Sequence, residues 1–340
     1  MRNSSRRGCR VRVLATMTAL VAAAAGGVAG CGRGSGEGSL SVVRVAALRV
    51  VDDAPLFIAQ RRGLFARAGL DVRVTMVAQS PQAVPKLVNG SIDVVAGANY
   101  VSFFQADAHG VLPLRVVADA YQTLPHVTAV LPAPAMKDQI TQPGDLRGKT
   151  VAFSVLKSVT TMTFDKMLPT ISGVDPASVH HVEVAFPRMI AALKTNSVDA
   201  AYTIEPFTYA AEQQLGVQPI FDPTGPGTDQ TSGPTAAWPM SGYLAPKHWV
   251  DTHPHVAAVF QRVIQQAQAI ANKDPAAVER VLPTYTKIDK KTAANIALGY
   301  FPTSLSAKRL QRVADLAAES QLLPANFTVT PLIYTPKGHP

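Results

Sequence analysis

The sequence predicts an α/β fold made of two similar lobes, and three observations carry this prediction. The chain has 340 residues, of which 47% are hydrophobic and 16% charged, which is enough for two domains of ordinary size. From residue 42 onward, short β-like runs alternate with helix-like runs, as is typical of α/β folds with largely parallel sheets. A stretch of nine residues also recurs at a spacing of 106 positions.

Residue periodicity predicts the first elements of lobe 1. Residues 42–50 are apolar enough for a buried strand, and residues 54–62 have helical periodicity that ends at a glycine. Residues 64–68 add a helical turn that also ends at a glycine, because glycine adopts the left-handed conformation at little cost. Residues 71–77 alternate apolar and polar side chains, which predicts a strand.

The repeat relates residues 87–95 to residues 193–201. In each copy a helix ends at a residue that tolerates positive φ, Gly90 or Asn196, and a buried strand follows. The strand that precedes each copy matches its counterpart in the same register. We therefore expect two lobes built on one pattern.

The C-terminal quarter has the periodicity of helices that wrap around a core, with prolines near their starts or breaks. The expected helices cover residues 256–273, 275–282, 290–299 and 306–323.

The N-terminus has the pattern of an export signal, because five arginines and no acidic residue accompany an apolar run in residues 1–30. The run ends in Val-Ala-Gly-Cys, which resembles the lipobox of bacterial lipoproteins, where Cys31 takes the lipid and becomes the mature N-terminus. Residues 31–40 are rich in Gly and Ser and indicate a flexible tether. An uncleaved signal anchor is the alternative, and Sec and twin-arginine export both remain open.

Charge and cysteine content exclude several function classes. The formal net charge is +9, but a chain that starts after residue 30 carries 27 basic and 23 acidic residues, or about +4, so nucleic acid is not an expected partner. The chain contains only Cys9 and Cys31, too few for a disulfide scaffold or a cysteine zinc site. We expect neither a metal nor a cofactor.

An ordered set of motifs resembles the solute-binding proteins of ABC importers, in the subgroup for sulfonates, taurine, nitrate and the pyrimidine precursor of thiamine. These motifs lie at residues 54–59, 63–65, 69–72, 89–93, 145–149, 198–201 and 205–207. The resemblance covers residues 41–330.

This resemblance implies a type II periplasmic-binding-protein fold, with two α/β lobes around a ligand cleft, a two-strand hinge and C-terminal helices. Lobe 1 is then expected at residues 41–125 and lobe 2 at residues 126–232, while residues 233–340 complete lobe 1 and supply the C-terminal helices.

The resemblance also implies a function, which is that of a monomeric, lipid-anchored receptor on the extracytoplasmic face of the cell membrane. Such a receptor binds a small nitrogen- or sulfur-containing organic solute and delivers it to an ABC permease and its ATPase subunit. A ligand-sensing domain for a membrane partner is one alternative. A pyrimidine-biosynthesis enzyme of the same fold is another, disfavoured because the lobes contain no cysteine and no known catalytic motif.

The repeat selects candidate ligand residues, because equivalent positions in two facing lobes should meet one cleft. Asp52 and Asp53 follow the first strand and correspond to Ser158 and its neighbour, and Asn99 corresponds to Glu205. We expect Asp53 to cap the helix that follows it, a role as compatible with its position as ligand contact. Glu205 is either a ligand acceptor or part of a structural turn.

Two further groups complete the candidates. The first group lies at the start of the helix near residue 160 and consists of Ser154, Ser158, Thr160 and Thr161. Their hydroxyls and the unpaired N–H groups of this helix end would bind acceptor groups of a ligand, or the hydroxyls would only cap the helix. Aromatic side chains offer flat faces for a planar ligand, or belong to the core, and these are Phe57, Tyr121 and Trp238. Asp93 and Asp199 start buried strands and are excluded.

The candidates also predict the ligand's charge. The two aspartates and Glu205 are acceptors, so we expect a ligand with donor groups, such as an amino-substituted pyrimidine, in preference to an inorganic anion. The hydroxyl-rich turn near residue 160 is the competing determinant.

Overall fold

The computed structural model describes residues 40–224 and 237–336. The chain divides into two units, residues 1–38 and residues 39–340, and the second is compact. The predicted signal segment, Cys31 and nearly all of the tether lie outside the described residues. Within those residues, no helix has both the length and the apolar character needed to span a bilayer.

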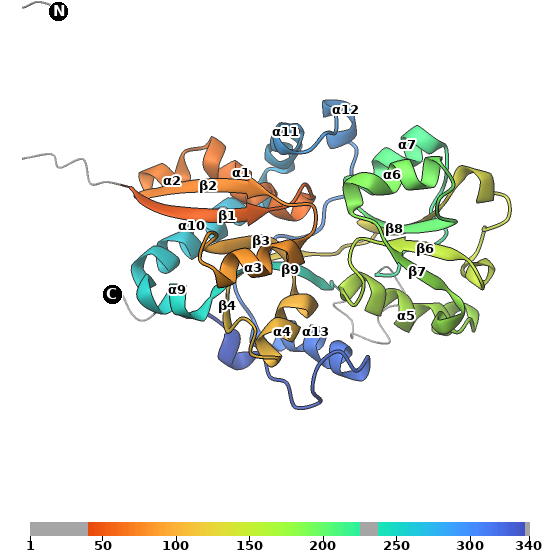
Figure 1. Ribbon diagram of the computed structural model, residues 1–340. Coiled ribbons are helices and arrows are strands. Elements are labelled where there is room, and N and C mark those ends of the chain that lie inside the picture. The colour runs from red at the N-terminus through yellow and green to blue at the C-terminus, as the bar shows by residue number, and fades with distance from the viewer. Residues whose placement is uncertain (1–39, 225–236, 337–340) are drawn as a thin grey trace, which may run out of the picture. The chain divides into compact units, whose positions relative to one another are not determined.

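Lobe 1 is built on a five-stranded sheet with the order β2-β1-β3-β9-β4 (Figure 1). Strands β1, β2 and β3 are parallel, and β9 runs antiparallel to β3 and β4. The strands are β1 (Ser41–Ala47), β2 (Leu70–Met76), β3 (Val94–Asn99), β4 (Leu114–Gln122) and β9 (Pro239–Pro246). The helices between them are α1 (Ala54–Arg61), α2 (Leu64–Arg67), α3 (Val84–Val88) and α4 (Tyr100–Ala108), with 3₁₀ turns η1 (Val51–Asp53) and η2 (Ser80–Ala83).

The C-terminal helices belong to the same part of the molecule, since α10 packs on α1 and β4, and α13 packs on α4. They are α9 (Lys247–Thr252), α10 (Pro254–Lys273), α11 (Pro275–Tyr285), α12 (Lys290–Ala293) and α13 (Ala307–Glu319), followed by the 3₁₀ turn η6 (Thr330–Leu332).

Lobe 2 is built on a four-stranded sheet with the order β5-β8-β6-β7, in which only β5 is antiparallel to its neighbour. Its strands are β5 (Thr128–Pro132), β6 (Thr150–Phe153), β7 (His180–Glu183) and β8 (Ala200–Ile204). Its helices are α5 (Val159–Ser172), α6 (Phe186–Lys194) and α7 (Phe207–Leu215), with 3₁₀ turns η3 (Pro134–Met136), η4 (Pro143–Leu146) and η5 (Pro176–Ser178).

Two chain segments connect the lobes, and they hydrogen-bond to each other. The Thr123 N–H, just after β4, donates to the Trp238 carbonyl at 3.0 Å, and the Trp238 N–H donates to Thr123 Oγ1 at 3.1 Å. The outgoing segment joins β4 to β5, and the returning one leads into β9. The predicted two-lobed α/β fold with paired crossings is confirmed.

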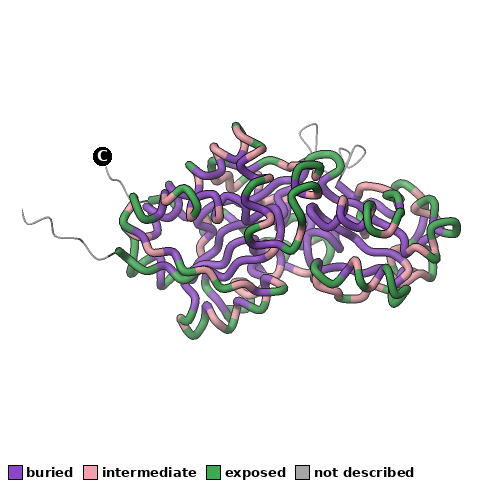
Figure 2. The backbone as a smooth tube through the Cα atoms, turned by 90° about the horizontal axis from the view of Figure 1, so that it is seen from above, coloured by how far each residue is buried: buried purple, intermediate pink, exposed green. Residues whose placement is uncertain are grey.

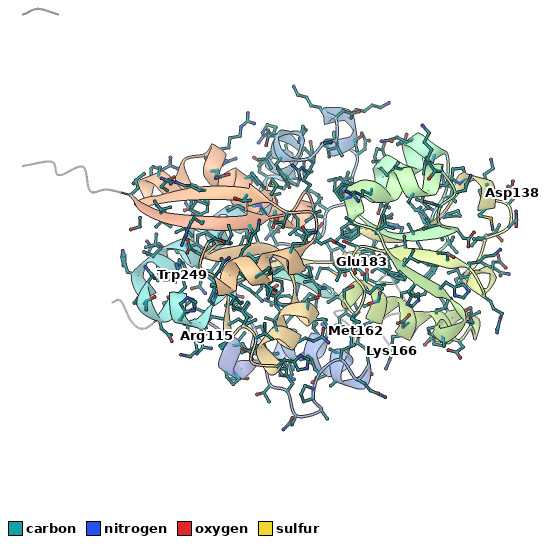
Figure 3. The ribbon with its side chains drawn as sticks, viewed as in Figure 1. Arg115, Asp138, Met162, Lys166, Glu183 and Trp249 are labelled. Atoms are coloured by element: carbon teal, nitrogen blue, oxygen red, sulfur yellow. The ribbon has the colours of Figure 1, made fainter. Side chains whose placement is uncertain are left out.

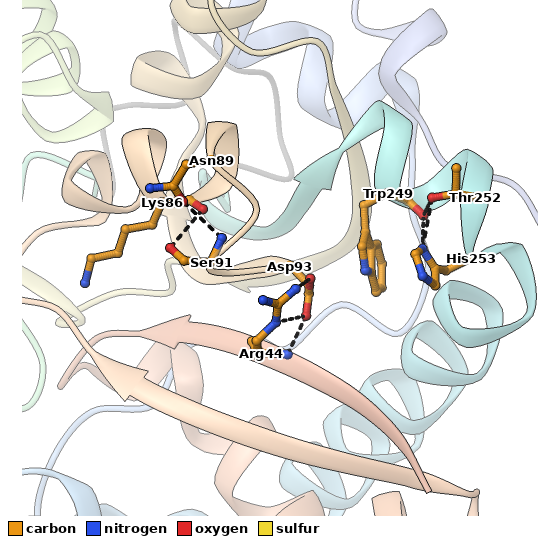
Figure 4. A network of polar contacts seen from close by, with 8 residues as sticks. All are labelled: Arg44, Lys86, Asn89, Ser91, Asp93, Trp249, Thr252 and His253. Atoms are coloured by element: carbon orange, nitrogen blue, oxygen red, sulfur yellow. Dashed lines mark hydrogen bonds and ion pairs between the residues drawn. The ribbon is translucent and has the colours of Figure 1, made fainter. Parts of the chain in front are cut away.

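The sequence repeat reappears as a repeat of hydrogen bonds. Asp93 Oδ2 accepts from the Arg44 N–H at 2.8 Å, and Asp199 Oδ2 accepts from the Thr150 N–H at 2.7 Å (Figure 4 shows the first pair). The partners in the two lobes differ by 106 positions, and the strands that follow pair in the same register. Each aspartate therefore fixes the start of a parallel strand pair, which is a structural role. Gly90 and Asn196 have φ values of 70° and 52°, as the helix-end pattern predicts.

The core of each lobe lies along its sheet, where Figure 2 shows continuous buried backbone. Strand β3 is buried along nearly its whole length, as expected for parallel strands covered on both faces. Hydrophobic burial thus stabilises each sheet and leaves the ends of the strands to carry polar groups.

Among the predicted elements that end earlier than expected, two do so for a clear physical reason. The predicted helix over residues 290–299 stops at Ala293, because the N–H groups of Ala297 and Gly299 donate to Glu205 Oε1 and Tyr121 Oη instead of to helical carbonyls. The first strand stops at Ala47, because the next N–H, of Leu48, donates to a carboxylate and not to a neighbouring strand.

Candidate functional site

A cavity of about 60 Å³ lies between the two lobes, where the parallel strands of both sheets end. At about 10 to 15 Å³ for each water, it has room for roughly five waters, the size of a small ligand or head group. Lobe 1 contributes Leu48, Val50, Asp52, Ser80, Gly97, Asn99, Met240 and Ser241, and lobe 2 contributes Ser154, Val155, Ser158, Val159, Thr160, Phe186 and Ile204.

Asp52 supplies the charge on the lobe 1 wall. Its side chain is buried, with 4% of the residue exposed, and its Oδ2 accepts from the Ser241 hydroxyl. Its Oδ1 has no hydrogen-bond partner among the described residues. Burial raises the pKa of Asp52 to about 6, against the lowering effect of the Ser241 hydrogen bond. At neutral pH the wall therefore holds a carboxylate.

Asp53 is not among the residues that line the cavity, and its predicted capping role is wrong. Its Oδ2 accepts from the Leu48 N–H at 2.6 Å, and α1 receives no side-chain cap. The physical reason is local: η1 continues directly into α1, so Asp53 has near-helical φ and ψ of −89° and 0°, whereas a capping side chain needs an extended backbone. The carboxylate also lies against Gly97, where an added Cβ would come within 3.0 Å of Oδ1.

The lobe 2 wall is the N-terminal end of helix α5. The Ser158 N–H donates to Thr161 Oγ1 at 2.8 Å, and Ser158 Oγ donates to the Val155 carbonyl at 2.7 Å. Ser158 Oγ also lies 2.8 Å from Thr160 Oγ1, so with its own proton committed it accepts from Thr160. The hydroxyl protons are thus used within the turn. In the capping box of α5 the Ser158 side chain takes the Thr161 N–H, and the N–H groups of Val159 and Thr160, which have no intrahelical acceptors, remain as donors at the positive end of the helix dipole.

Gln79 connects the lobes beside the cavity. Its Nε2 donates to the Ser154 carbonyl at 2.6 Å and to Glu183 Oε1 at 2.8 Å. The second oxygen of Glu183 accepts from the Leu156 N–H at 3.1 Å, which holds the carboxylate in place. Figure 3 shows Glu183 on the side of lobe 2 that faces lobe 1.

Asn99 lines the cavity, but its side chain is occupied. Its Oδ1 accepts from the Val101 N–H at 3.1 Å, which caps α4, and its Nδ2 donates to Ser102 Oγ at 3.1 Å. Its N–H donates to Ser80 Oγ. Asn99 therefore shapes this wall more than it offers free polar groups.

Glu205, which the repeat equates with Asn99, does not line the cavity. Its Oε1 accepts from the Ala297 N–H at 3.2 Å and its Oε2 from the Tyr209 N–H at 3.1 Å. Burial raises the pKa of Glu205 to about 8 in spite of these two hydrogen bonds. The side chain links the end of β8 to the segment after α12.

The three aromatic candidates also lie outside the cavity lining. Phe57 stacks on Tyr285 with a centroid distance of 3.9 Å, and Tyr121 Oη accepts from the Gly299 N–H at 2.5 Å. Trp238 is buried beneath the Arg312 guanidinium, which lies 5.0 Å from its ring.

Five of the predicted ligand residues line the cavity: Asp52, Asn99, Ser154, Ser158 and Thr160. Thr161 is taken up in the turn before α5. The polar residues that sequence reasoning missed are Ser80 and Ser241. Ser80 follows β2, so the rule that ligands lie beyond the carboxyl ends of strands would have selected it. Ser241 lies on β9, outside the repeat, where no sequence signal marks it.

Across residues 40–224 and 237–336, His, Cys, Asp and Glu side chains form no group of three or more suited to a metal ion.

Comparison with known proteins confirms the resemblance noted from the sequence. The family model described as "NMT1/THI5 like" matches residues 51–278. No curated protein gives a significant match.

Solved structures of binding proteins share the fold. The alkanesulfonate-binding protein SsuA from Xanthomonas axonopodis pv. citri, bound to MOPS, has a TM-score of 0.69 and 21% identity, over 86% of this chain and 98% of that one. The aliphatic sulphonate-binding SsuA from Escherichia coli has a TM-score of 0.67 and 20% identity, over 89% and 94%. The nitrate-binding NrtA from Synechocystis PCC 6803 has a TM-score of 0.69 and 17% identity, over 84% and 83%. These neighbours are binding proteins and not enzymes.

Proposed function

The chain belongs to the NMT1/THI5-like family, and from this premise we propose that it is the solute-binding receptor of an ABC importer. The observation that carries the proposal is the small cavity between the lobes, to which each lobe contributes polar groups from the ends of its strands. Its walls provide a carboxylate and a helix N-terminus, which suit recognition of a small polar solute. The likeness in fold to sulfonate- and nitrate-binding proteins supports this function.

Binding in such a receptor is coupled to closure of the lobes. In the described part of the chain two segments cross between the sheets, so the lobes can rotate about Thr123 and Trp238. Closure brings Gln79 to Ser154 and Glu183 and encloses the solute. The closed form is then the one that an ABC permease, with its ATPase subunit, recognises.

We further propose that Cys31 carries a lipid anchor and that the receptor works as a monomer on the extracytoplasmic face of the cell membrane. The motif that ends in Cys31 and the Gly/Ser-rich stretch after it support this placement. The mass of the protein from the membrane fraction tests it: the expected chain starts at a diacylated Cys31. An intact chain with residues 1–30 still attached would contradict lipidation.

The receptor function is tested by a screen of solutes against the full chain in detergent, together with mass spectrometry of solutes that copurify. A true ligand raises the thermal midpoint, because it binds only the folded state. Val155→Trp fills the cavity and should abolish that rise, whereas Val111→Trp, at a position with 56% exposure, should leave it unchanged. If no solute shifts the midpoint and none copurifies, or if the two variants behave alike, the proposed function is wrong.

A further inference from the structure

A second hollow lies on lobe 1, apart from the cavity between the lobes. Its volume is about 180 Å³, and its walls are helices α1 and α11, which pack against each other (Figure 1). The lining residues are Ile58, Arg61 and Arg62 from α1 and its C-terminal end, and Ala277, Arg280 and Val281 from α11. The two linings share no residue, so this hollow is a separate place with its own chemistry.

Helical spacing explains why three arginines meet in this hollow. In each wall the lining residues are spaced i, i+3 and i+4, which places them on one face of the helix. The first member of each set, Ile58 or Ala277, is buried, and so is Val281. These apolar side chains form the floor of the hollow, while the arginines are exposed and form its rim.

One carboxylate orients two of the arginines. Asp274, the residue before α11, has its Oδ2 3.3 Å from Arg62 Nη2 and 2.9 Å from Arg280 Nη2. Because each guanidinium has five N–H donors, most donors of these two arginines remain for a ligand. The two side chains are 44% and 57% exposed, so a solute can reach them. Asp274 thus holds together two guanidinium groups that belong to different walls.

Arg61 supplies a third positive charge. Its guanidinium has no hydrogen bond or ion pair with any residue that the structure describes. Three guanidinium groups and one carboxylate leave an excess of two positive charges at the hollow. Like charges repel one another, and a bound anion with a charge near −2 would offset this repulsion. A phosphate monoester carries about −1.5 to −2 at pH 7, and arginine binds its oxygens in a bidentate manner.

We propose that this hollow is a second binding site of the chain, for a phosphate-type oxyanion. Arg61, Arg62 and Arg280 donate N–H groups to the phosphate oxygens, and Asp274 keeps the last two arginines in place. The apolar floor accommodates the first carbons of a phosphate ester. The phosphate belongs either to a free solute or to the head group of a membrane lipid, since both present the same oxyanion. The site does not depend on which solute the cavity between the lobes binds.

Calorimetry on the full chain in nonionic detergent tests this site, in a buffer without phosphate or sulfate. The probes are inorganic phosphate, pyrophosphate, glycerol 3-phosphate and dihexanoyl phosphatidate, and sodium chloride at matched ionic strength is the reference. We expect at least one phosphate probe to bind with a Kd below about 1 mM. Tighter binding of a water-soluble phosphate identifies a free solute as the ligand, and tighter binding of the short-chain phosphatidate identifies a lipid head group.

Arg61→Gln and Arg280→Gln are the diagnostic variants. Each should weaken binding of the phosphate probe at least about fivefold, because each removes charged hydrogen-bond donors. Arg147→Gln, at an exposed arginine of lobe 2, is the matched control and should change Kd less than about twofold. Val155→Trp fills the cavity between the lobes and should leave phosphate binding unchanged. Circular dichroism establishes that all four variants are folded.

Three outcomes would overturn the inference. In the first, no phosphate probe binds. In the second, Arg61→Gln and Arg147→Gln weaken binding equally, which would mean that only the overall charge attracts the anion. In the third, Val155→Trp abolishes binding and the variants at Arg61 and Arg280 retain it, which would place the anion between the lobes. The receptor function is judged separately in each case, by the solute screen and by copurified solutes.

Discussion

Gln79 in lobe 1 donates a hydrogen bond of 2.8 Å to Glu183 Oε1 in lobe 2, and the two residues are 104 positions apart in the sequence. The same nitrogen lies 2.6 Å from the Ser154 carbonyl, and Ser154 lines the cavity. Because Gln79 follows β2 and Glu183 ends β7, the contact holds together two strand ends that meet beside the cavity. It exists only while the lobes are this close.

Gln79→Ala should therefore weaken ligand binding without unfolding either lobe. A hydrogen bond of this kind contributes a net free energy of about 0.5 to 1.5 kcal/mol. We therefore expect the Kd of the ligand to rise about three- to tenfold, mainly through faster dissociation. Calorimetry and stopped-flow kinetics measure the two quantities. Gln214→Ala, at an exposed position of α7, is the control. An unchanged dissociation rate in Gln79→Ala would show that this contact does not hold the closed form.

The sequence predicted cavity-lining residues at positions that the repeat relates in the two lobes. Asp52 and Ser158 are equivalent positions, and both line the cavity, since Asp52 follows β1 and Ser158 follows the equivalent strand β6. Leu48 and Ser154 are a second such pair. Residues outside the repeat escaped prediction: Ser241 meets Asp52 only because β9 returns from a segment 189 positions away.

Glu205 and Asp53 show why side-chain roles were harder to predict than strands. The repeat aligns Glu205 with Asn99, which lines the cavity. The segment after α12 packs against Glu205, however, and the Ala297 N–H donates to its carboxylate. Asp53 has the sequence context of a helix cap, yet the 3₁₀ turn before it sets a backbone conformation that turns its side chain to Leu48. The Glu205 outcome depends on tertiary packing, which local patterns do not encode, and the Asp53 outcome depends on a 3₁₀ turn that the residue pattern did not reveal.

Glu205 should make the protein less stable as pH rises. Burial raises its pKa to about 8 in the folded state from an ordinary value of 4.5, so between these values the folded state binds more protons than the unfolded state. The free energy of unfolding then falls as pH rises through this window, by up to about 1.4 kcal/mol per pH unit. Glu205→Gln should flatten the slope between pH 6 and pH 8, whereas Glu279→Gln in α11 should not. Urea unfolding measures both slopes, and equal slopes for wild type and Glu205→Gln would rule out this assignment.

Arg309 should be important for the stability of lobe 1. Its Nε lies 2.8 Å from Asp119 Oδ2, and Asp119, which also accepts from Tyr100 at 2.7 Å, has a fully buried side chain. Arg309→Met leaves that carboxylate without its cation and should destabilise the fold by about 3 to 5 kcal/mol in urea unfolding.

Two comparisons make the Arg309 result specific. Adding Asp119→Asn to Arg309→Met removes the uncompensated charge and should restore part of the loss. Arg73→Met breaks an exposed ion pair with Asp71, where the arginine side chain is 66% exposed, and should cost less than about 1 kcal/mol. A loss in Arg309→Met no larger than in Arg73→Met would contradict the prediction.

The pH dependence of ligand binding should identify the charge that Asp52 recognises. Burial raises the pKa of Asp52 to about 6, so the carboxylate is ionised at pH 7 and largely protonated at pH 5. A ligand amine requires the ionised form, and Kd for a solute that places an amine against Asp52 should therefore rise about tenfold between pH 7 and pH 5. A simple anion would show the opposite sign, because protonation of Asp52 removes a like charge from its surroundings. Asp52→Asn should abolish the dependence in either case. Calorimetric Kd values at pH 5, 6 and 7 decide between these outcomes, and a Kd that decreases when the pH is lowered from 7 to 5 would exclude an amine at Asp52.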